Sequence, residues 1–396
     1  KQGYYLQGKI LNYNWGGISY ISQFLNFPIT PNTRYAEYWL GAHISNPSNC
    51  SISNQQFPLN AIIKNNPWIL KNNQTSYTDE LPFLLKLLDV QQMLSIQLHP
   101  NKLQAEQGFE KENNKQIPLN AYNRTYKDNN HKPEMLISLN NEFWLLHGFK
   151  KKQLILQDFN QYPIFNNLAA ILQVKGIPAF FEYIMLANQT EIDFYLMPFL
   201  DQIKLNNFNK SQPAYWIQKY LSFNPQKMNI DRSLFCIFLL NIVCVPYKKA
   251  IFQHAGIPHA YLEGQNIEIM GNSDNVIRGG LTEKYIDITA LLTLINYNEI
   301  EPEIFSYFEQ EKGVQIYPSK CGDFGIDWLD FSHVDILHFT ADSITIFLVL
   351  SGEGNFNNQF NFKKGASFFV PAGTKYSIKA NNSTNIIKSY IPINEN

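Results

Sequence analysis

The pattern of apolar and polar positions changes twice along the 396-residue chain. The first 150 residues mix short apolar runs with Gly, Pro and Asn, and after Ser233 short β-like runs with frequent turns continue to the C-terminus. Between about residues 151 and 226, apolar residues instead recur three and four positions apart. This pattern predicts a mainly β protein that carries a helical insert.

The helical period is clearest in four segments of the insert, at residues 152–159, 167–173, 177–188 and 213–220. The clearest strand is residues 93–99, in which Ser95, Gln97 and His99 occupy alternate positions and therefore share one face. The most apolar run, residues 234–245, is much shorter than the roughly twenty residues of a membrane span. We expect it to be a core segment and expect no membrane association.

Composition narrows the class of partner. The 32 Lys and Arg residues nearly balance the 33 Asp and Glu residues, and no basic block stands out, so we expect no nucleic-acid partner and favour a small ligand. The four cysteines are scattered without a Cys-x-x-Cys pair, which favours free buried thiols in a reducing compartment. Since no leader segment is visible either, we expect a cytoplasmic protein. We also expect a monomer.

Candidate metal ligands lie beside prolines in three separate segments. His99 precedes Pro100, Glu134 follows Pro133, and His259 follows Pro258. Imidazole and carboxylate ligands without a thiolate leave a divalent ion Lewis acidic, which favours a catalytic over a structural metal. The alternative is that both histidines are ordinary hydrogen-bonded residues and that Glu134 is solvated. Spacing along the chain leaves both interpretations open.

An internal similarity favours two related β units. Residues 248–261 and 363–376 each carry lysines, a small residue, an aromatic residue and then a glycine turn, as in a jelly-roll hairpin. Where the first copy has His259, the second has Lys375, whose ammonium group has no lone pair for a metal. Only the first unit is expected to bind metal.

Several motifs, in one order along nearly the whole chain, resemble the type I mannose-6-phosphate isomerase family, also called phosphomannose isomerase. They lie at residues 12–16 (NYNWG), 36–43 (AEYWLGAH), 81–86 (LPFLLK), 95–102 (SIQLHPNK), 108–113 (GFEKEN), 126–134 (YKDNNHKPE), 258–262 (PHAYL) and 272–282 (NSDNVIRGGLT). The resemblance implies a zinc-dependent enzyme with two cupin-type jelly-roll barrels and an α-helical domain. It places the metal-binding barrel in residues 1–150 and 227–300, the helical domain in 151–226 and a barrel without metal in 301–396.

The resemblance also implies roles for individual residues, and these are stated only as its implications. One zinc ion per chain would be bound by Gln97, His99, Glu134 and His259. Arg278 matches the active-site arginine of the family, and the pocket positions are matched by Ser95, Lys132, Tyr261, Glu268 and Lys284. Among these, Ser95 matches a proposed phosphate contact, and Lys132 and Lys284 would supply cations for the phosphate.

The implied reaction interconverts mannose 6-phosphate and fructose 6-phosphate through a cis-enediol. Arg278 and the zinc ion would stabilise the oxyanion that develops on O1 or O2 of the sugar. Because a guanidinium remains protonated, Arg278 is a poor base. Glu268 or a water on the metal is the preferred base, since either can be tuned toward neutral pH.

The sequence departs from the usual family pattern at Gly279, Glu283 and residues 252–257, but keeps every implied ligand and Arg278. Two other classes stay open. A sugar-phosphate sensor would keep the metal without turnover, although it would not need Arg278, Lys284 and Glu268 together. Another metal cupin, such as an iron oxygenase or a cupin-type phosphoglucose isomerase, would favour more histidines than the pair of Gln97 and His99 provides.

Overall fold

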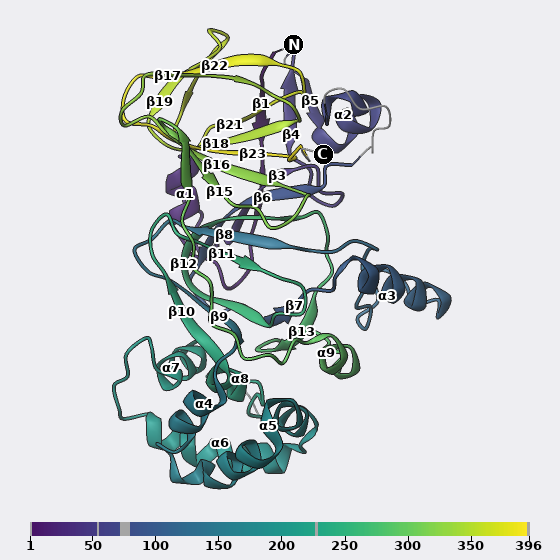
Figure 1. Cartoon of the computed structure of the whole chain (residues 1–396), viewed down its shortest axis with the longest axis vertical. Helices are drawn as coiled ribbons and strands as arrows, with labels where there is room; N and C mark the ends of the chain where they lie inside the picture. Colours follow the sequence, from purple (N-terminus) through teal and green to yellow (C-terminus); the bar gives the residue numbers. More distant parts are fainter. Residues whose placement is uncertain (1, 54, 72–79, 226–228, 394–396) are drawn as a thin grey trace.

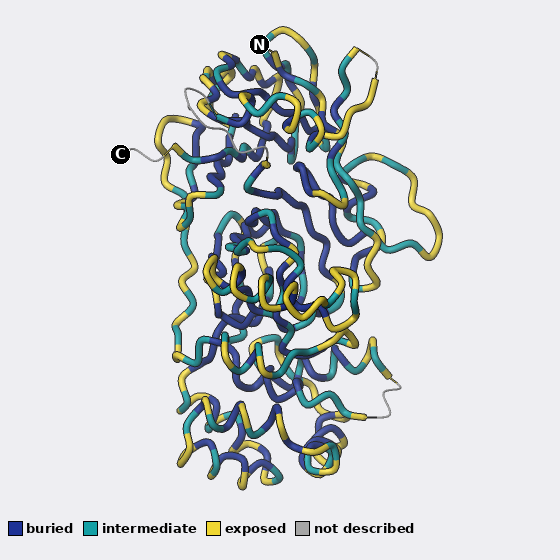
Figure 2. Tube along the Cα trace, turned by 90° about the vertical axis from the view of Figure 1, so that its right-hand side faces the viewer, coloured by how far each residue is buried: buried dark blue, intermediate teal, exposed yellow. Residues whose placement is uncertain are grey.

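The computed structural model describes residues 2–53, 55–71, 80–225 and 229–393. Figure 1 shows three regions stacked along the long axis: C-terminal strands with the N-terminal ones, a central group of strands, and helices at the opposite end. Buried residues run through all three regions, with exposed residues gathered on the outer turns and helices (Figure 2). The mainly β architecture with a helical part, expected from the sequence, is confirmed.

The central region is a ten-stranded sheet. Its main path runs in the order β10 (Leu240–Val245), β9 (Phe143–Phe149), β12 (His259–Gly271), β6 (Phe83–Val90), β3 (Glu37–Gly41) and β2 (Lys9–Leu11). Four shorter strands attach beside this path, namely β7 (Ile96–Leu98), β8 (Glu134–Ser138), β11 (Ala250–Gln253) and β13 (Ile277–Gly280). Strand β12 pairs with β6, β7, β8 and β9 along its length, so it organises the whole region.

The other strands form a nine-stranded and a four-stranded sheet. The larger has the order β14 (Phe308–Glu311), β15 (Val314–Tyr317), β16 (Gly325–Asp330), β23 (Asn385–Tyr390), β18 (Thr345–Ser351), β21 (Ser367–Val370), β1 (Tyr4–Gln7), β4 (Asn49–Ile52), β5 (Gln55–Pro58). The smaller has the order β17 (Ile336–Thr340), β22 (Lys375–Ala380), β19 (Glu353–Phe356), β20 (Phe360–Lys363). None of the three sheets closes on itself over the described residues, and the two cupin barrels stay a prediction.

The first strand of the chain lies outside the central sheet. β1 pairs with β21, with Tyr4 opposite Phe369, so the start of the chain belongs to the C-terminal sheet and not to the central one. A strand finds its partners through edge hydrogen bonds and a buried face, and neither is visible in local sequence. The boundary expected at residues 226 and 227 lies outside the described residues.

The chain between β9 and β10, two strands that pair with each other, is helical. Its helices are α4 (Lys152–Phe159), the short 3₁₀ helix η2 (Pro163–Phe165), α5 (Asn166–Leu186), α6 (Gln189–Ile203), α7 (Pro213–Phe223) and α8 (Leu234–Leu239). The four predicted helical segments all lie within these helices, apart from the last two residues of the segment 177–188, whereas α6 was not predicted. The return to β structure comes at Leu240 and not at Ser233, because a continuous apolar run has no period that separates a buried helix from a buried strand.

Helix α5 belongs to a segment, Pro163–Leu186, that is long and apolar enough by composition to cross a membrane. Core helices of globular proteins pass the same test. The helix has a kink at Gly176, with φ 76° and ψ 175°, and it buries Leu172, Phe180 and Ile184 in the largest core cluster. We therefore interpret it as a core helix.

The remaining helices border the sheets: α1 (Tyr20–Leu25), α2 (Leu59–Asn65) with the 3₁₀ helix η1 (Pro67–Ile69), α3 (Lys102–Asn114) and α9 (Ile288–Leu294). The sequence pattern did not predict α3, whose surface is polar almost all round. It begins with a capping box, in which the side chains of Asn101 and Gln104 each accept a hydrogen bond from the other residue's backbone N–H. The strand predicted at 93–99 is shorter than expected, and β7 covers only Ile96–Leu98.

Candidate metal centre and substrate pocket

Three strands bring His99, Glu134 and His259 together. Glu134 begins β8, His259 begins β12, and His99 follows the last residue of β7. The ligand atoms that the three residues offer all lie within 4.8 Å of one another, and each residue is at most 1% exposed. Of the two interpretations that the sequence left open, the structure therefore favours a shared metal site.

The hydrogen bonds of the two imidazoles fix which nitrogen is free. His99 Nδ1 lies 2.8 Å from the carbonyl oxygen of Asn275, and His259 Nδ1 lies 2.9 Å from that of Ile257. A carbonyl oxygen only accepts, so each Nδ1 carries the proton and each Nε2 presents a lone pair. Burial lowers the pKa of His99 to about 4, which keeps this imidazole neutral near pH 7.

The two Nε2 lone pairs face the carboxylate of Glu134 at 3.3 Å each. Burial alone would raise the pKa of Glu134, but the ammonium group of Lys132, whose Nζ lies 3.0 Å from Oε1, holds it well below the ordinary value. Three acceptors therefore converge, and both Nε2 atoms and Oε2 of Glu134 are buried without a hydrogen-bond partner among the described residues. Such an arrangement fits a bound cation, because buried acceptors without partners are costly.

Gln97 is the fourth ligand that the resemblance implies. It lies in β7 directly opposite His259 in the antiparallel register, and opposite Arg278 on its other side in β13. Residues directly opposite in adjacent strands have side chains on the same face. Gln97 therefore shares the face of both a metal ligand and the implied active-site arginine.

A buried ionic cluster lies on the central sheet near the metal ligands, with residues from β3, β6 and β12. Lys86 Nζ lies 2.9 Å from Oε1 of Glu268 and 3.9 Å from Oε2 of Glu37, and the hydroxyl of Tyr261 donates to Oε2 of Glu268 at 2.7 Å. Burial alone would lower the pKa of Lys86, but Glu268, Glu37 and Glu134 raise it above its ordinary value. Both oxygens of the predicted base Glu268 thus already accept a hydrogen bond.

Several cationic side chains line a cavity of about 330 Å³. It is lined by Lys127, Arg278 and Lys284, together with Tyr122, Arg124, Thr125, Asp274, Val276, Tyr285 and Asp287. Burial lowers the pKa of Lys127, Arg278 and Lys284, and for Lys284 the charges of Arg278 and Lys127 lower it further. Among the described residues, neither Arg278 nor Lys284 forms an ion pair, and Arg278 donates only to the hydroxyl of Ser95, at 3.3 Å. The cations of the lining outnumber its two carboxylates, Asp274 and Asp287, and such an excess of positive charge suits a phosphate.

Every site residue predicted from the sequence lies in one of these three groups or beside them. The sequence analysis gave no role to Lys86, Glu37, Lys127 or Asp274. Lys86 did leave a signal, because a lysine in the middle of the apolar strand β6 must be buried and therefore paired. Asp274 lies between the groups, because it lines the cation-rich cavity and is also close enough to Lys132 and Lys86 to be affected by their charges. Burial alone would raise the pKa of Asp274. Its contact with His43 lowers the pKa below the ordinary value, and Lys132 and Lys86 add to this effect.

A family model for the catalytic domain of type I phosphomannose isomerase matches residues 4–152. Mannose-6-phosphate isomerase of Escherichia coli (strain K12) is 30% identical over 387 residues, which cover 93% of this chain and 94% of that protein. The chain belongs to the type I mannose-6-phosphate isomerase family. The family inferred from the sequence motifs is thereby confirmed.

Solved structures of this family agree over the whole length. A zinc-bound mannose 6-phosphate isomerase has a TM-score of 0.89 at 28% identity, covering 99% of this chain and 100% of that one. The enzyme from Salmonella typhimurium bound to substrate and to zinc has a TM-score of 0.88, with the same identity and coverage. His99, Glu134 and His259 offer the nitrogen and carboxylate ligands that zinc takes, which agrees with the cofactor expected from the sequence.

Proposed function

We propose that the chain is a zinc-dependent mannose-6-phosphate isomerase, which interconverts mannose 6-phosphate and fructose 6-phosphate. The observation that carries this proposal is the convergence of three partnerless metal-ligand atoms close to a cavity with several cations. An enzyme that isomerises a phosphorylated sugar in this way needs a metal beside the sugar oxygens and cations that bind the phosphate. The relatives named above carry the same activity in their names.

We infer that Gln97 completes the ligand set with its amide oxygen. Its register opposite His259 supports this assignment. With Glu134 as the single anionic ligand, the bound ion would keep a net charge of +1 and would supply Lewis acidity to the sugar oxygens. Lys132 holds Glu134 ionised, and the carbonyl groups of Asn275 and Ile257 orient the two imidazoles.

We assign the phosphate to the cation-rich cavity. We keep Lys284 as a phosphate ligand, and Lys127 would join it there. Lys132, the other cation expected for the phosphate, pairs with Glu134 and does not line this cavity, so we propose that it acts on Glu134 instead. Ser95 stays a proposed phosphate contact, and its hydrogen bond with Arg278 would also orient that side chain. Arg278 would then place its guanidinium beside the sugar oxygen that becomes negative when a proton moves between C2 and C1 through a cis-enediol. The register of Arg278 opposite Gln97 supports its position between the phosphate and the metal ligands.

For the proton transfer we keep Glu268 or a water on the metal as the proposed base, with Lys86 and Tyr261 as the groups that hold the carboxylate of Glu268 in place. Either base would act on a C–H that is acidified by a polarised carbonyl beside it. The guanidinium of Arg278, beside the sugar oxygen O1 or O2, would provide part of that polarisation.

The division into two cupin barrels and a helical domain, amended for β1, β4 and β5, stays our proposal for the domain organisation. The monomeric state and the cytoplasmic location are also proposals. Light scattering of the purified chain tests the first, and fractionation of the source cells tests the second.

The decisive experiment measures conversion of mannose 6-phosphate to fructose 6-phosphate by the purified chain in three states: as isolated, after chelation, and after zinc is restored. We expect activity that disappears and returns. A folded, zinc-loaded protein without conversion would contradict the proposed reaction. Activity that survives complete chelation would contradict the role of the metal alone.

A further inference from the structure

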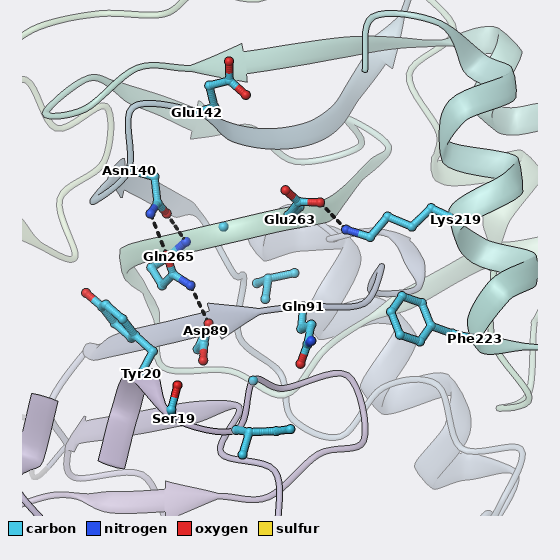
Figure 3. Close-up of a pocket in the computed structure, with 14 residues that line it drawn as sticks. Ser19, Tyr20, Asp89, Gln91, Asn140, Glu142, Lys219, Phe223, Glu263 and Gln265 are labelled. Atoms are coloured by element: carbon cyan, nitrogen blue, oxygen red, sulfur yellow. Dashed lines mark hydrogen bonds and ion pairs between the residues drawn. The ribbon is translucent and has the colours of Figure 1, made fainter. Parts of the chain in front are cut away.

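A second cavity lies on another side of the central sheet, where the helices and the N-terminal segment meet it. Its volume is about 620 Å³, and its lining comes from β6, β12, α7, the turn before β9 and residues 17–20. Tyr20 lies at one side and Phe223 at the other in Figure 3. No described residue of its lining belongs to the metal centre or to the cation-rich cavity.

Amide and carboxylate side chains face this space. Asn140 donates to Oε1 of Gln265 at 2.6 Å, and Gln265 in turn donates through Nε2 to Oδ1 of Asp89, also at 2.6 Å (Figure 3). Asp89 is 4% exposed, and burial raises its pKa. Its second oxygen, Oδ2, has no hydrogen-bond partner among the described residues, and it is not one of the fully buried polar atoms without partners. It is therefore open to the cavity and can accept a hydrogen bond from a ligand.

The main chain leaves room for that carboxylate. A Cβ atom on Gly17 would lie 1.8 Å from Oδ2 of Asp89, so any other residue at position 17 would displace it. Gly17 also donates its backbone N–H to the carbonyl oxygen of Asp89 at 3.2 Å. The polar edge of the cavity is therefore built by close approach of two segments and not by an exposed loop.

The charges argue against an anionic ligand. Lys219 contacts Oε2 of Glu263, and Lys210 lies 2.8 Å from Oε1 of the same carboxylate and 3.6 Å from Glu142. Among the described residues that line the cavity, Lys219 is the one cation, against Asp89, Glu142 and Glu263. A phosphate would meet net negative charge here, in contrast to the cation-rich cavity.

We propose that this cavity is a second ligand site, specific for a neutral polyhydroxylated molecule such as an unphosphorylated sugar. Hydroxyl groups can donate to Oδ2 of Asp89 and to Glu263 while they accept from Gln91 and Asn140. The half-exposed ring of Phe223, which is 38% exposed, offers an apolar face for the C–H side of a sugar ring. The volume lies within the range of small-molecule sites, and the mostly polar lining suits a ligand with many hydroxyl groups.

Strand β12 runs through both this cavity and the catalytic site. It carries Glu263, Gly264 and Gln265 in this cavity, and His259, Tyr261 and Glu268 in the metal centre and ionic cluster. The strand has a bulge between Tyr261 and Glu263 in its pairing with β9, between the residues of the two sites.

The test uses the zinc-loaded full chain with saturating fructose 6-phosphate and measures binding of D-mannose, D-glucose and their methyl glycosides by saturation-transfer NMR and calorimetry. We expect saturable binding of at least one probe in the millimolar range. Asp89→Asn should weaken it about tenfold. Phe223→Ala should weaken it several-fold, and Phe194→Ala, on the exposed face of α6, serves as the matched control and should leave it unchanged.

Four outcomes would overturn the proposal: no binding of any probe, binding that fructose 6-phosphate abolishes, equal binding by the two phenylalanine variants, or calcium binding that Asp89→Asn removes when no sugar binds. Since Phe223 is exposed, its variant keeps the test valid if Asp89→Asn does not fold. The readout is binding in a cavity that shares no described residue with the metal centre, so this proposal can fail without the proposed function failing.

Discussion

His99 Nδ1 donates a hydrogen bond to the backbone carbonyl oxygen of Asn275 at 2.8 Å. The side chain of Asn275 holds the segment that leads to Glu134: its Oδ1 accepts from the backbone N–H of Lys127 at 2.7 Å, and its Nδ2 donates to the carbonyl oxygens of Asp128 and Asn130 at 2.8 Å each. One buried asparagine thus orients one metal ligand and anchors the loop before another.

We expect Asn275→Ala to lower zinc affinity about 10–100-fold, the usual effect of losing a group that supports a ligand. The loop at 127–130 would lose five hydrogen bonds, and the carbonyl that orients His99 would be held less firmly. Competition with a chromogenic chelator measures the affinity. Asn206→Ala, an exposed asparagine of the helical region, is the control. Equal zinc affinity in the two variants would contradict the positioning role of Asn275.

Removal of the metal should destabilise the fold. Chelation would leave Nε2 of His99, Nε2 of His259 and Oε2 of Glu134 buried without partners. We expect the thermal midpoint to fall on chelation and to recover with zinc, by several degrees at zinc concentrations well above Kd. A midpoint that does not respond in calorimetry would argue against a metal at these three residues.

Substitutions of Arg278 and Lys284 should change different kinetic constants. We expect Arg278→Ala to lower kcat about 10²–10³-fold, because it would remove a group that acts on charge in the transition state. Lys284→Ala should mainly raise KM for mannose 6-phosphate, about tenfold, because it would remove phosphate affinity. Lys312→Ala, at an exposed turn, is the control. A lower kcat with unchanged KM for Lys284→Ala would move Lys284 from the phosphate to the reacting end of the sugar.

Glu263 should contribute stability that disappears in acid. Burial would raise its pKa, but hydrogen bonds from Lys210 and Lys219 lower it below the ordinary value. A carboxyl group with a lowered folded-state pKa contributes stability that is complete above its unfolded-state pKa and is lost as pH falls through the folded-state value. We expect Glu263→Gln to cost about 1 kcal/mol at pH 7, because the group is partly exposed. Urea unfolding should show the difference shrinking below about pH 4.

His147 should also make the fold less stable as pH falls, but in a higher pH window than Glu263. Burial, with a smaller contribution from His259, lowers its pKa to about 4, although Gln253 accepts a hydrogen bond from it. Between the ordinary value of 6.5 and about 4, the unfolded chain binds a proton that the folded chain does not. Stability should therefore fall as pH falls through this window, by at most about 3 kcal/mol for this group. His147→Gln should have a flatter pH profile of unfolding in the chelated protein, and an unchanged slope would contradict the assignment.

The class of fold, the family and the candidate metal ligands could all be read from the sequence. Alternation and the 3.6-residue period depend on local burial, so the strand near His99 and most helices within 152–223 could be predicted. Long motifs fix residue types in order, which is why Gln97, His99, Glu134, His259 and Arg278 could be named before any distance was known.

Only the tertiary structure shows which residues contact one another. Local sequence does not show that β1 joins the C-terminal sheet, nor that Leu234–Leu239 is helical, because edge pairing and full burial are set by distant partners. The pairing of Lys86 with Glu268, the gathering of Lys127 with Arg278 and Lys284, and the cavity beside Asp89 also come from segments far apart in the chain. Charge pairs and cavities depend on distance in space, and the sequence records only order along the chain.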